Sequence, residues 1–269
     1  MNMLTISPIR AFSDNYIWLI VRNNQAFVVD PGEPGPVLAT LQAENVELSG
    51  ILITHHHFDH TGAVAALKTE TGCEVWGPAD SPAGPYDRTV TEGDTVSLLG
   101  VDFSVLNVPG HTLDHIAYYS PTQQALFCGD TLFVGGCGRV FEGTPPQMRR
   151  SLEKLRGLPP ETLIFCAHEY TLANLRFARL VEPNNRALGA FLSACEAKRA
   201  NDEPTVPSRI SDELACNPFL RWDSHEIRET LKASGRLADD TSDGVFTAVR
   251  EWKNTCLLYT SDAADDETS

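Results

Sequence analysis

The distribution of apolar and polar residues changes along the chain at about Tyr170. Before that point, short runs of apolar β-forming residues are separated by turn residues and a few helical stretches, a pattern typical of mixed α/β structure. After it, apolar residues recur at helical spacing and rarely alternate with polar ones. The pattern therefore predicts a larger α/β domain over residues 1–172 and a smaller all-α domain over residues 173–254.

The expected elements follow from local signals. Asn23-Asn24 separates two apolar runs and predicts a hairpin, and a helix is expected to end near Asn45. Residues 78–94 are rich in Pro, Gly and Asp and are expected to form a loop, while Pro204 and Pro207 interrupt the helical half. The pattern predicts strands at residues 4–9, 15–21, 26–30, 50–54, 74–78, 95–100, 101–109, 115–120, 125–133 and 162–168, and helices at 59–72, 145–157, 172–183, 185–202, 210–222, 224–235 and 243–253.

A cluster of histidines follows the strand at residues 50–54. Four of the eight histidines of the chain lie within positions 55–60, in the run His-His-His-Phe-Asp-His. His55 and His57 are two positions apart, so an extended strand end points both side chains the same way and His56 the other way. Asp59 and His60 lie past the bend and are expected to face a second ion. Because imidazole and carboxylate together suit zinc and similar divalent metals, this stretch predicts a metal site.

Three more strands end at a residue of the same kind, namely His111, Asp130 and His168. A carboxylate that follows a fully apolar strand must be paired or ligated, because an isolated buried charge is costly. The two oxygens of Asp130 can also bridge two ions, which a neutral imidazole cannot do. His115 and Asp30 are expected to support ligands rather than to bind metal. The predicted ligands are His55, His57 and His111 for one ion, Asp59, His60 and His168 for another, and Asp130 for both.

Two ions held about 3.5–4 Å apart can lower the pKa of a bridging water and hold the resulting hydroxide as a nucleophile. The ligand set therefore predicts hydrolysis of an acyl bond or a phosphodiester. Asp130 is expected to be catalytic as the shared ligand, and Asp59 as a ligand that also shuttles a proton.

Charge and cysteine content narrow the class of protein. The formal net charge of −15 argues against nucleic acid or an anionic membrane as a partner. The seven cysteines are odd in number and widely spaced, which favours reduced thiols and a cytoplasmic location. We see no signal-peptide pattern at the N-terminus and no apolar run long enough to span a membrane. The protein is expected to be a monomer. The acidic tail at residues 255–269 is expected to be disordered or non-native.

Several motifs resemble a known family. The run THHHFDHTG, followed in order by PGHT, CGDTLF and CAHEYT, resembles the metallo-β-lactamase superfamily. This resemblance implies an α/β fold, an αββα sandwich with a dinuclear site at one edge. The longer stretches FCGDTLFVGGCGRVFEGTPPQM, CAHEYTLANLRFA, NPFLR and VREWK are similar to the glyoxalase II (hydroxyacylglutathione hydrolase) family. In that family the catalytic domain is followed by a helical domain that supplies part of the glutathione site.

The resemblance implies a thioester hydrolase that cleaves S-D-lactoylglutathione to glutathione and D-lactate, the second step of methylglyoxal detoxification. The cofactor would be two divalent metal ions, with zinc expected and iron or manganese as alternatives. Glutathione-binding positions of the family match Arg139, Tyr170, Arg250 and Lys253. These cations suit the carboxylates of glutathione in an otherwise acidic protein. Phe141 departs from the Tyr of some relatives, which removes at most one hydrogen bond, about 1 kcal/mol.

Alternatives remain at this stage. Another metallo-β-lactamase-fold enzyme is possible, either a small ester or lactone hydrolase or a persulfide dioxygenase with one iron. The negative net charge argues against the hypothesis of a nuclease. The complete ligand set argues against a regulatory module with a degenerate site. From the helical pattern alone, Arg250 and Lys253 are expected on a solvated helix face.

Overall fold

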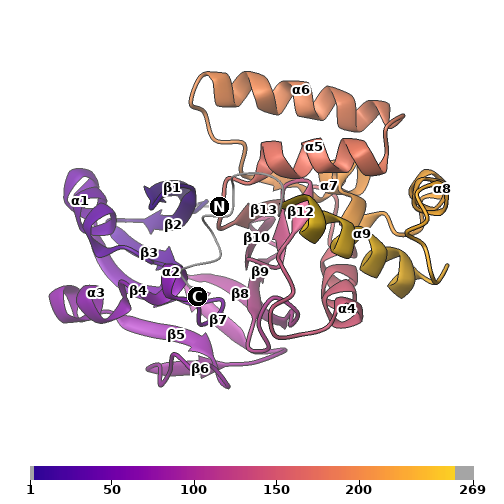
Figure 1. Ribbon diagram of the computed structural model, residues 1–269. Coiled ribbons are helices and arrows are strands. Elements are labelled where there is room, and N and C mark those ends of the chain that lie inside the picture. The colour runs from indigo at the N-terminus through magenta and orange to yellow at the C-terminus, as the bar shows by residue number, and fades with distance from the viewer. Residues whose placement is uncertain (1–2, 258–269) are drawn as a thin grey trace.

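The computed structural model describes residues 3–257, and two six-stranded sheets form its centre (Figure 1). The first sheet has the order β1-β2-β3-β4-β5-β6 and the second the order β14-β13-β10-β9-β8-β7. Apolar side chains from both sheets, among them Trp18, Leu52 and Phe127, share one buried core. A separate apolar layer, which includes Val37 and Leu67, joins helices α1 and α3 to the outer face of the first sheet.

The first sheet begins with two antiparallel hairpins and continues with parallel strands. Asn23 and Asn24 have φ angles of 51° and 60°, as a tight type I′ turn requires, so the predicted hairpin is confirmed. The helices between the parallel strands cross over its outer face. The elements are β1 (Thr5–Ala11), β2 (Asn15–Arg22), β3 (Gln25–Val29), α1 (Pro34–Glu44), β4 (Glu47–Leu52), α2 (Phe58–Thr61), α3 (Val64–Thr71), β5 (Glu74–Pro78) and β6 (Arg88–Val90).

The second sheet is mostly antiparallel, apart from the parallel pair β10 and β13 that helix α4 connects. All five residues of β10 are buried, as expected for a strand covered on both faces. Its elements are β7 (Thr95–Leu98), β8 (Val101–Asn107), β9 (Ile116–Ser120), β10 (Ala125–Gly129), α4 (Pro145–Arg156), β13 (Leu163–Cys166) and β14 (Ser208–Arg209), with a small hairpin of β11 (Leu132–Phe133) and β12 (Gly136–Cys137).

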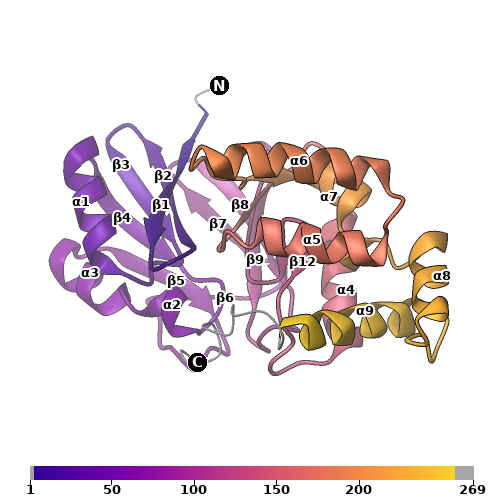
Figure 2. The ribbon, with the colours of Figure 1, turned by 45° about the horizontal axis from the view of Figure 1, so that its top comes forward.

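The remaining elements are helical, as the pattern after Tyr170 predicts. Helices α5 and α6 lie side by side, and α9 lies against α4 (Figure 2). Asn185 caps α6 by accepting a hydrogen bond from the backbone N–H of Leu188 at 3.0 Å. The helices are α5 (Thr171–Val181), α6 (Arg186–Ala200), α7 (Ile210–Cys216), the 3₁₀ turn η1 (Pro218–Leu220), α8 (His225–Ala233) and α9 (Ser242–Leu257).

Several local predictions differ from the structure. The expected loop at residues 78–94 contains the short edge strand β6, and β12 and β14 are also too short to leave a sequence pattern. The single helix expected at residues 59–72 is divided, because the N–H of Ala63 donates to the carbonyl of Pro31 (3.0 Å) instead of continuing the helix. Helix α9 continues to Leu257, three residues beyond the expected end of the helical domain. The rest of the expected tail, residues 258–269, lies outside the described residues.

Among the residues that the structure describes, no helix is both long enough and apolar enough to cross a bilayer.

A buried polar network joins the helices to the β11–β12 hairpin. Glu213 of α7 is fully buried and accepts hydrogen bonds from the backbone N–H of Gly135 (2.8 Å) and from the Ser208 hydroxyl (2.7 Å). Asn217 donates to Glu213 (2.9 Å) and to the carbonyl of Gly136 (2.9 Å). Burial raises the pKa of Glu213 to about 7, even though these donors favour the ionised form.

This raised pKa predicts a pH-dependent stability. The folded protein binds a proton at Glu213 that the unfolded chain releases near the ordinary value of 4.5, so the stabilisation falls as the pH rises from about 4.5 to 7. Glu213→Gln keeps the shape and can accept from Gly135 and Asn217 while it donates to Ser208. We expect the difference in free energy of unfolding, variant minus parent, to rise by about 2 kcal/mol between about pH 5.5 and pH 8.5.

Urea denaturation of the metal-loaded protein at the two pH values measures this difference. Glu203→Gln, a substitution of an exposed carboxylate, is the matched control and should show no such rise. A Glu213→Gln difference that is independent of pH would show that Glu213 is ionised in the folded protein throughout this range.

Candidate metal centre

The run that follows β4 brings two histidines to the edge of the first sheet, and the second sheet supplies a third. Ligand atoms of His55, His57 and His111 all lie within 4.8 Å of one another. His111 comes from the loop after β8, where the N–H of Gly110 donates to the carbonyl of Thr112 (3.0 Å) in a tight turn. These are the three residues that the sequence predicts around the first ion, and we refer to them as the first group.

A second group lies beside the first. Ligand atoms of Asp59, His60 and His168 also lie within 4.8 Å of one another. The Oδ2 atom of Asp59 is 3.3 Å from the Nε2 atom of His60 and 3.3 Å from that of His168. Asp59 and His60 belong to α2, whereas His168 follows β13, so both sheets contribute here as well.

Asp130 lies between the two groups. Its Oδ1 atom is 3.4 Å from His60 Nε2, and its Oδ2 atom is 3.4 Å from His168 Nε2 and 3.5 Å from His111 Nε2. It follows β10 at Gly129, which has a φ of 46°. A Cβ atom at Gly129 would lie 2.3 Å from the Thr54 hydroxyl, so a larger residue there would displace the strand end. The carboxylate thus faces ligand atoms of both groups, as the prediction of a shared ligand requires.

The donor set fits divalent metal ions. Within residues 3–257, His55 Nε2 and Asp130 Oδ1 are buried and have no hydrogen-bond partner, which is unusual for interior polar atoms. Burial lowers the pKa of His55 and lowers that of His111 to about 4, so both imidazoles are neutral, as metal binding requires. Burial alone would raise the pKa of Asp130, but His168 and His60 hold it well below its usual range. A cation at this position would take over that stabilisation.

Neighbouring residues orient the ligands. Asp30 accepts hydrogen bonds from both the backbone N–H (2.8 Å) and the hydroxyl (2.7 Å) of Thr54, and its Oδ2 atom lies 3.1 Å from His60 Nδ1. Its ligand atoms also lie close to those of His55 and His60, but these bonds give it the supporting position that the sequence predicts. His115 Nε2 accepts a hydrogen bond from the backbone N–H of Asp130 (3.1 Å), which is a supporting position too.

His56 points to a different set of partners from those of His55 and His57. Its Nδ1 atom lies 2.9 Å from Asp114 Oδ1, and its Nε2 atom lies 3.3 Å from Glu142 Oε1. It belongs to neither group of ligand atoms, in agreement with the alternation expected for an extended strand end.

Two residues near the centre are absent from the predicted set. The Nδ1 atom of His168 lies 2.7 Å from Asp14 Oδ1, and the Asn15 amide donates to Asp59 Oδ2 at 2.9 Å. Asp14 ends the turn between β1 and β2, and Asn15 is the first residue of β2. The sequence signal is weak, since polar residues at a turn are ordinary and the contact with His168 spans 154 positions.

Three of the five predicted substrate-binding residues, Arg139, Phe141 and Tyr170, lie beside the two groups. The Phe141 ring packs against the rings of His57 and His111, with centroids 5.8 and 5.2 Å apart, and is 46% exposed. The guanidinium of Arg139 lies over Phe141, 5.3 Å from the ring centroid. Tyr170 stacks on His168, with ring centroids 4.7 Å apart.

The expectation of a solvated helix face for Arg250 and Lys253 is wrong. These side chains are only 3% and 6% exposed, because α9 packs onto the β11–β12 hairpin and the start of α5. Arg250 donates to the carbonyl of Cys137 (3.1 Å), and Lys253 donates to that of Ala173 (3.3 Å). Helical spacing alone cannot reveal such a packing partner. Arg and Lys are rarely buried to this extent unless they are paired, and both side chains here donate to backbone carbonyls.

The fold and the paired ligand groups define a metallo-β-lactamase superfamily protein, and the family model "Metallo-beta-lactamase superfamily" matches residues 11–168. The model "Hydroxyacylglutathione hydrolase C-terminus" matches residues 169–256. Curated hydroxyacylglutathione hydrolases of Chromohalobacter salexigens and Pseudomonas aeruginosa are 49% and 48% identical, over 94% of this chain and 99% of theirs. The chain therefore belongs to the hydroxyacylglutathione hydrolase family, also called glyoxalase II.

Solved structures agree on the fold. ETHE1 from Myxococcus xanthus is 26% identical with a TM-score of 0.63, over 94% of this chain and 99% of that chain. The B3 metallo-β-lactamase BLEG-1 is 22% identical with a TM-score of 0.62, over 81% of this chain and 100% of that chain. The expected αββα sandwich with a helical C-terminal region is thus confirmed, and the His and Asp clusters support divalent metal binding.

Metal content tests the assignment of the two groups. We expect the purified protein to bind about two divalent ions per chain, and His55→Ala or His168→Ala to bind about one, because each removes a ligand from one group. His56→Ala is the matched control, since this neighbouring histidine contacts Asp114 and Glu142 instead, and it should keep both ions. Elemental analysis of each protein, with circular dichroism to check folding, gives the result. Two ions retained in His168→Ala would exclude it as a ligand.

Proposed function

We propose that the protein hydrolyses S-D-lactoylglutathione, and other 2-hydroxyacylglutathiones, to glutathione and the free hydroxy acid at a centre of two divalent metal ions. With the lactoyl substrate this is the second step of methylglyoxal detoxification. The observation that carries the proposal is the position of Asp130, whose two oxygens face ligand atoms of both groups. Membership of the hydroxyacylglutathione hydrolase family supports the thioester as substrate.

The ligands of the centre are His55, His57, Asp59, His60, His111, Asp130 and His168. When bound, two ions supply an activated water and polarise the thioester carbonyl. A carbon–oxygen bond forms, the carbon–sulfur bond breaks, and a proton passes to the leaving sulfur. Asp59 is placed to pass that proton on, because its side chain is partly exposed beside the second group. It would not retain the proton, since His60 and His168 outweigh the effect of burial and lower its pKa well below the usual range. Zinc is the expected metal, since three histidines with carboxylate suit it, although the same donors also accept iron or manganese.

The glutathione part of the substrate is bound by Arg139, Phe141, Tyr170, Arg250 and Lys253. Phe141 and Tyr170 border the two ligand groups, so a thioester between them would lie near Asp130. The cations match the carboxylates of glutathione in a protein with a net charge of −15. In this scheme residues 1–172 form the catalytic domain, and the helical domain at residues 173–254 completes the binding site.

We also propose that the enzyme is cytoplasmic and monomeric. All seven cysteines lie within the described residues and are free thiols, and six of them are buried. Reduced thiols of this kind are typical of a reducing compartment, which is also where glutathione is abundant in its thiol form.

Turnover of S-D-lactoylglutathione tests the reaction. We expect rapid loss of the thioester absorbance, and a fall in kcat/KM of at least about 100-fold in Asp130→Asn and in His168→Ala, because each substitution weakens the binding of the metals. Asp202→Asn is the control, since this exposed carboxylate pairs with Arg10 and should be nearly neutral.

Other outcomes point to specific alternatives. Unchanged turnover in both metal-ligand variants would exclude the dinuclear mechanism. Two bound ions without thioester hydrolysis would keep the centre and assign the protein to another hydrolase of this fold. One iron per chain with oxygen uptake on glutathione persulfide would identify a dioxygenase.

Phe141→Tyr tests the substrate surface. If the ring faces bound glutathione, as its position beside His57, His111 and Arg139 supports, a hydroxyl there adds one hydrogen bond. We expect KM to fall by about fivefold with kcat unchanged, the equivalent of about 1 kcal/mol. Phe141→Leu keeps an apolar side chain without the hydroxyl and should not lower KM. An unchanged KM in Phe141→Tyr would place the substrate away from this ring.

A further inference from the structure

Two consecutive residues, the last of the turn between β1 and β2 and the first of β2, contact the second group. Asp14 Oδ1 lies 2.7 Å from His168 Nδ1, and the Asn15 amide donates to Asp59 Oδ2 at 2.9 Å. A histidine ligand that donates its other N–H to a carboxylate is fixed in orientation and becomes a stronger donor to metal. An amide that donates to a ligand carboxylate orients that group in the same way. Both supports act on the second group.

The turn and the segment around His168 are held together by several further bonds. The N–H of Glu169 donates to the carbonyl of Asp14 (3.0 Å), and the N–H of Tyr16 donates to the carbonyl of Ala167 (2.6 Å). The Tyr16 hydroxyl also donates to the Glu169 carboxylate at 2.7 Å. The backbone on either side of His168 is therefore bound to Asp14 and Tyr16. These bonds hold Asp14 at a constant position relative to the imidazole.

The first group has different supports. His111 Nδ1 lies 2.7 Å from the carbonyl of Arg139, and His55 Nδ1 lies 3.0 Å from the Thr54 hydroxyl. These partners lie in the loop after β12 and at the end of β4, away from the turn between β1 and β2. Asp130 and the bonded pair Asp30–Thr54 contact both groups, since Asp30 lies against His60 and Thr54 against His55. Asp14 and Asn15, in contrast, contact ligands of the second group, so their supports can be altered separately.

We infer that Asp14 and Asn15 are positioning residues that set the metal affinity of the second group independently of the first. The inference rests on the proposed dinuclear centre. It adds that different neighbouring residues orient the ligands of the two metals. Loss of either side chain would leave the ligands in place but free to rotate, so the second ion would be bound more weakly while the first is retained.

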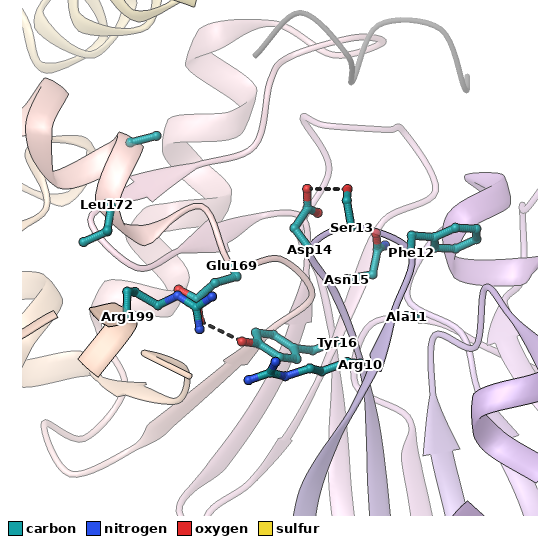
Figure 3. Close-up of a pocket in the computed structure, with 11 residues that line it drawn as sticks. Arg10, Ala11, Phe12, Ser13, Asp14, Asn15, Tyr16, Glu169, Leu172 and Arg199 are labelled. Atoms are coloured by element: carbon teal, nitrogen blue, oxygen red, sulfur yellow. Dashed lines mark hydrogen bonds between the residues drawn. The ribbon is translucent and has the colours of Figure 1, made fainter. Parts of the chain in front are cut away.

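The surroundings of the turn make substitutions there informative. Asp14 and Asn15 line a pocket of about 410 Å³, with Tyr16 and Glu169 on the opposite wall (Figure 3). Because the Asp14 side chain borders this pocket rather than the packed core, its truncation creates no enclosed cavity. A folded Asp14→Ala variant is therefore expected, and any change in metal binding reports on the lost contact with His168.

The test measures zinc retained by the full-length, zinc-loaded protein after equilibration against chelator-buffered free zinc. We expect two dissociation constants for the parent protein. Asp14→Ala and Asn15→Ala should each raise one of them by about 10- to 100-fold and leave the other unchanged. Asp14→Asn keeps an oxygen that can accept from His168 and should recover part of the loss. Asp202→Asn is the control, since this exposed carboxylate pairs with Arg10, which borders the same pocket, rather than with Asp14, Asn15 or a ligand.

Double variants show which group is affected. The effect of Asp14→Ala should disappear in a His168→Ala background, because the partner is already lost, and persist in a His57→Ala background, where the second group is intact. Equal weakening of both constants, no weakening of either, or an additive effect in the His168→Ala background would each overturn the inference. Fewer than two zinc ions in the parent protein would instead refute the dinuclear centre, and this inference with it.

Discussion

The cost of burying Asp130 is the constraint on which the rest of the centre depends. Its carboxylate is only 6% exposed and follows a strand with no exposed residue, where an unpaired negative charge would be very unfavourable. His60 and His168 stabilise that charge, each with its Nε2 atom 3.4 Å from a carboxylate oxygen, and the neutral His111 lies 3.5 Å away. His60 comes from α2 and His168 from the end of β13, so both sheets must meet at this edge for the charge to be balanced. The metal centre therefore depends on the packing of the two sheets.

The predictable part of the site is the part that lies at strand ends. Apolar runs predict the strands. A titratable residue directly after a buried strand needs a charged partner or a metal, because burying it alone is costly. His55, His111, Asp130 and His168 follow from this rule, and their convergence follows from the packing of two sheets whose strands end at one edge. The positions of Asp59 and His60 do not follow from this rule, because both lie in α2. This helix is a single turn, whose length the helical pattern overestimates.

Two of the residues that support the ligands could not be predicted from the sequence. Asp14 and Asn15 belong to an ordinary turn and the first position of β2, and their contacts with His168 and Asp59 cross 154 and 44 positions of sequence. Arg250 has the same difficulty, since its partner Cys137 lies 113 positions away in a two-residue strand. Local patterns describe which residues an element has, whereas these contacts depend on which element lies opposite. The division of one expected helix at Ala63 is another long-range effect, caused by the carbonyl of Pro31.

The relation between the helices and the sheets explains how one fold can serve different substrates. The sandwich is shared with a B3 metallo-β-lactamase at 22% identity, so the sheets alone do not determine the substrate. In this protein the segment from β11 to Phe141 links the helices to the ligand groups. Glu213 and Asn217 bind its hairpin from α7, Arg250 binds Cys137 from α9, and the carbonyl of Arg139 binds His111. The same short segment thus touches the helices at one end and a ligand of the first group at the other. A change in how the helices pack would shift Arg139 and Phe141 together with the orientation of His111, so the proposed substrate surface and this ligand are structurally coupled.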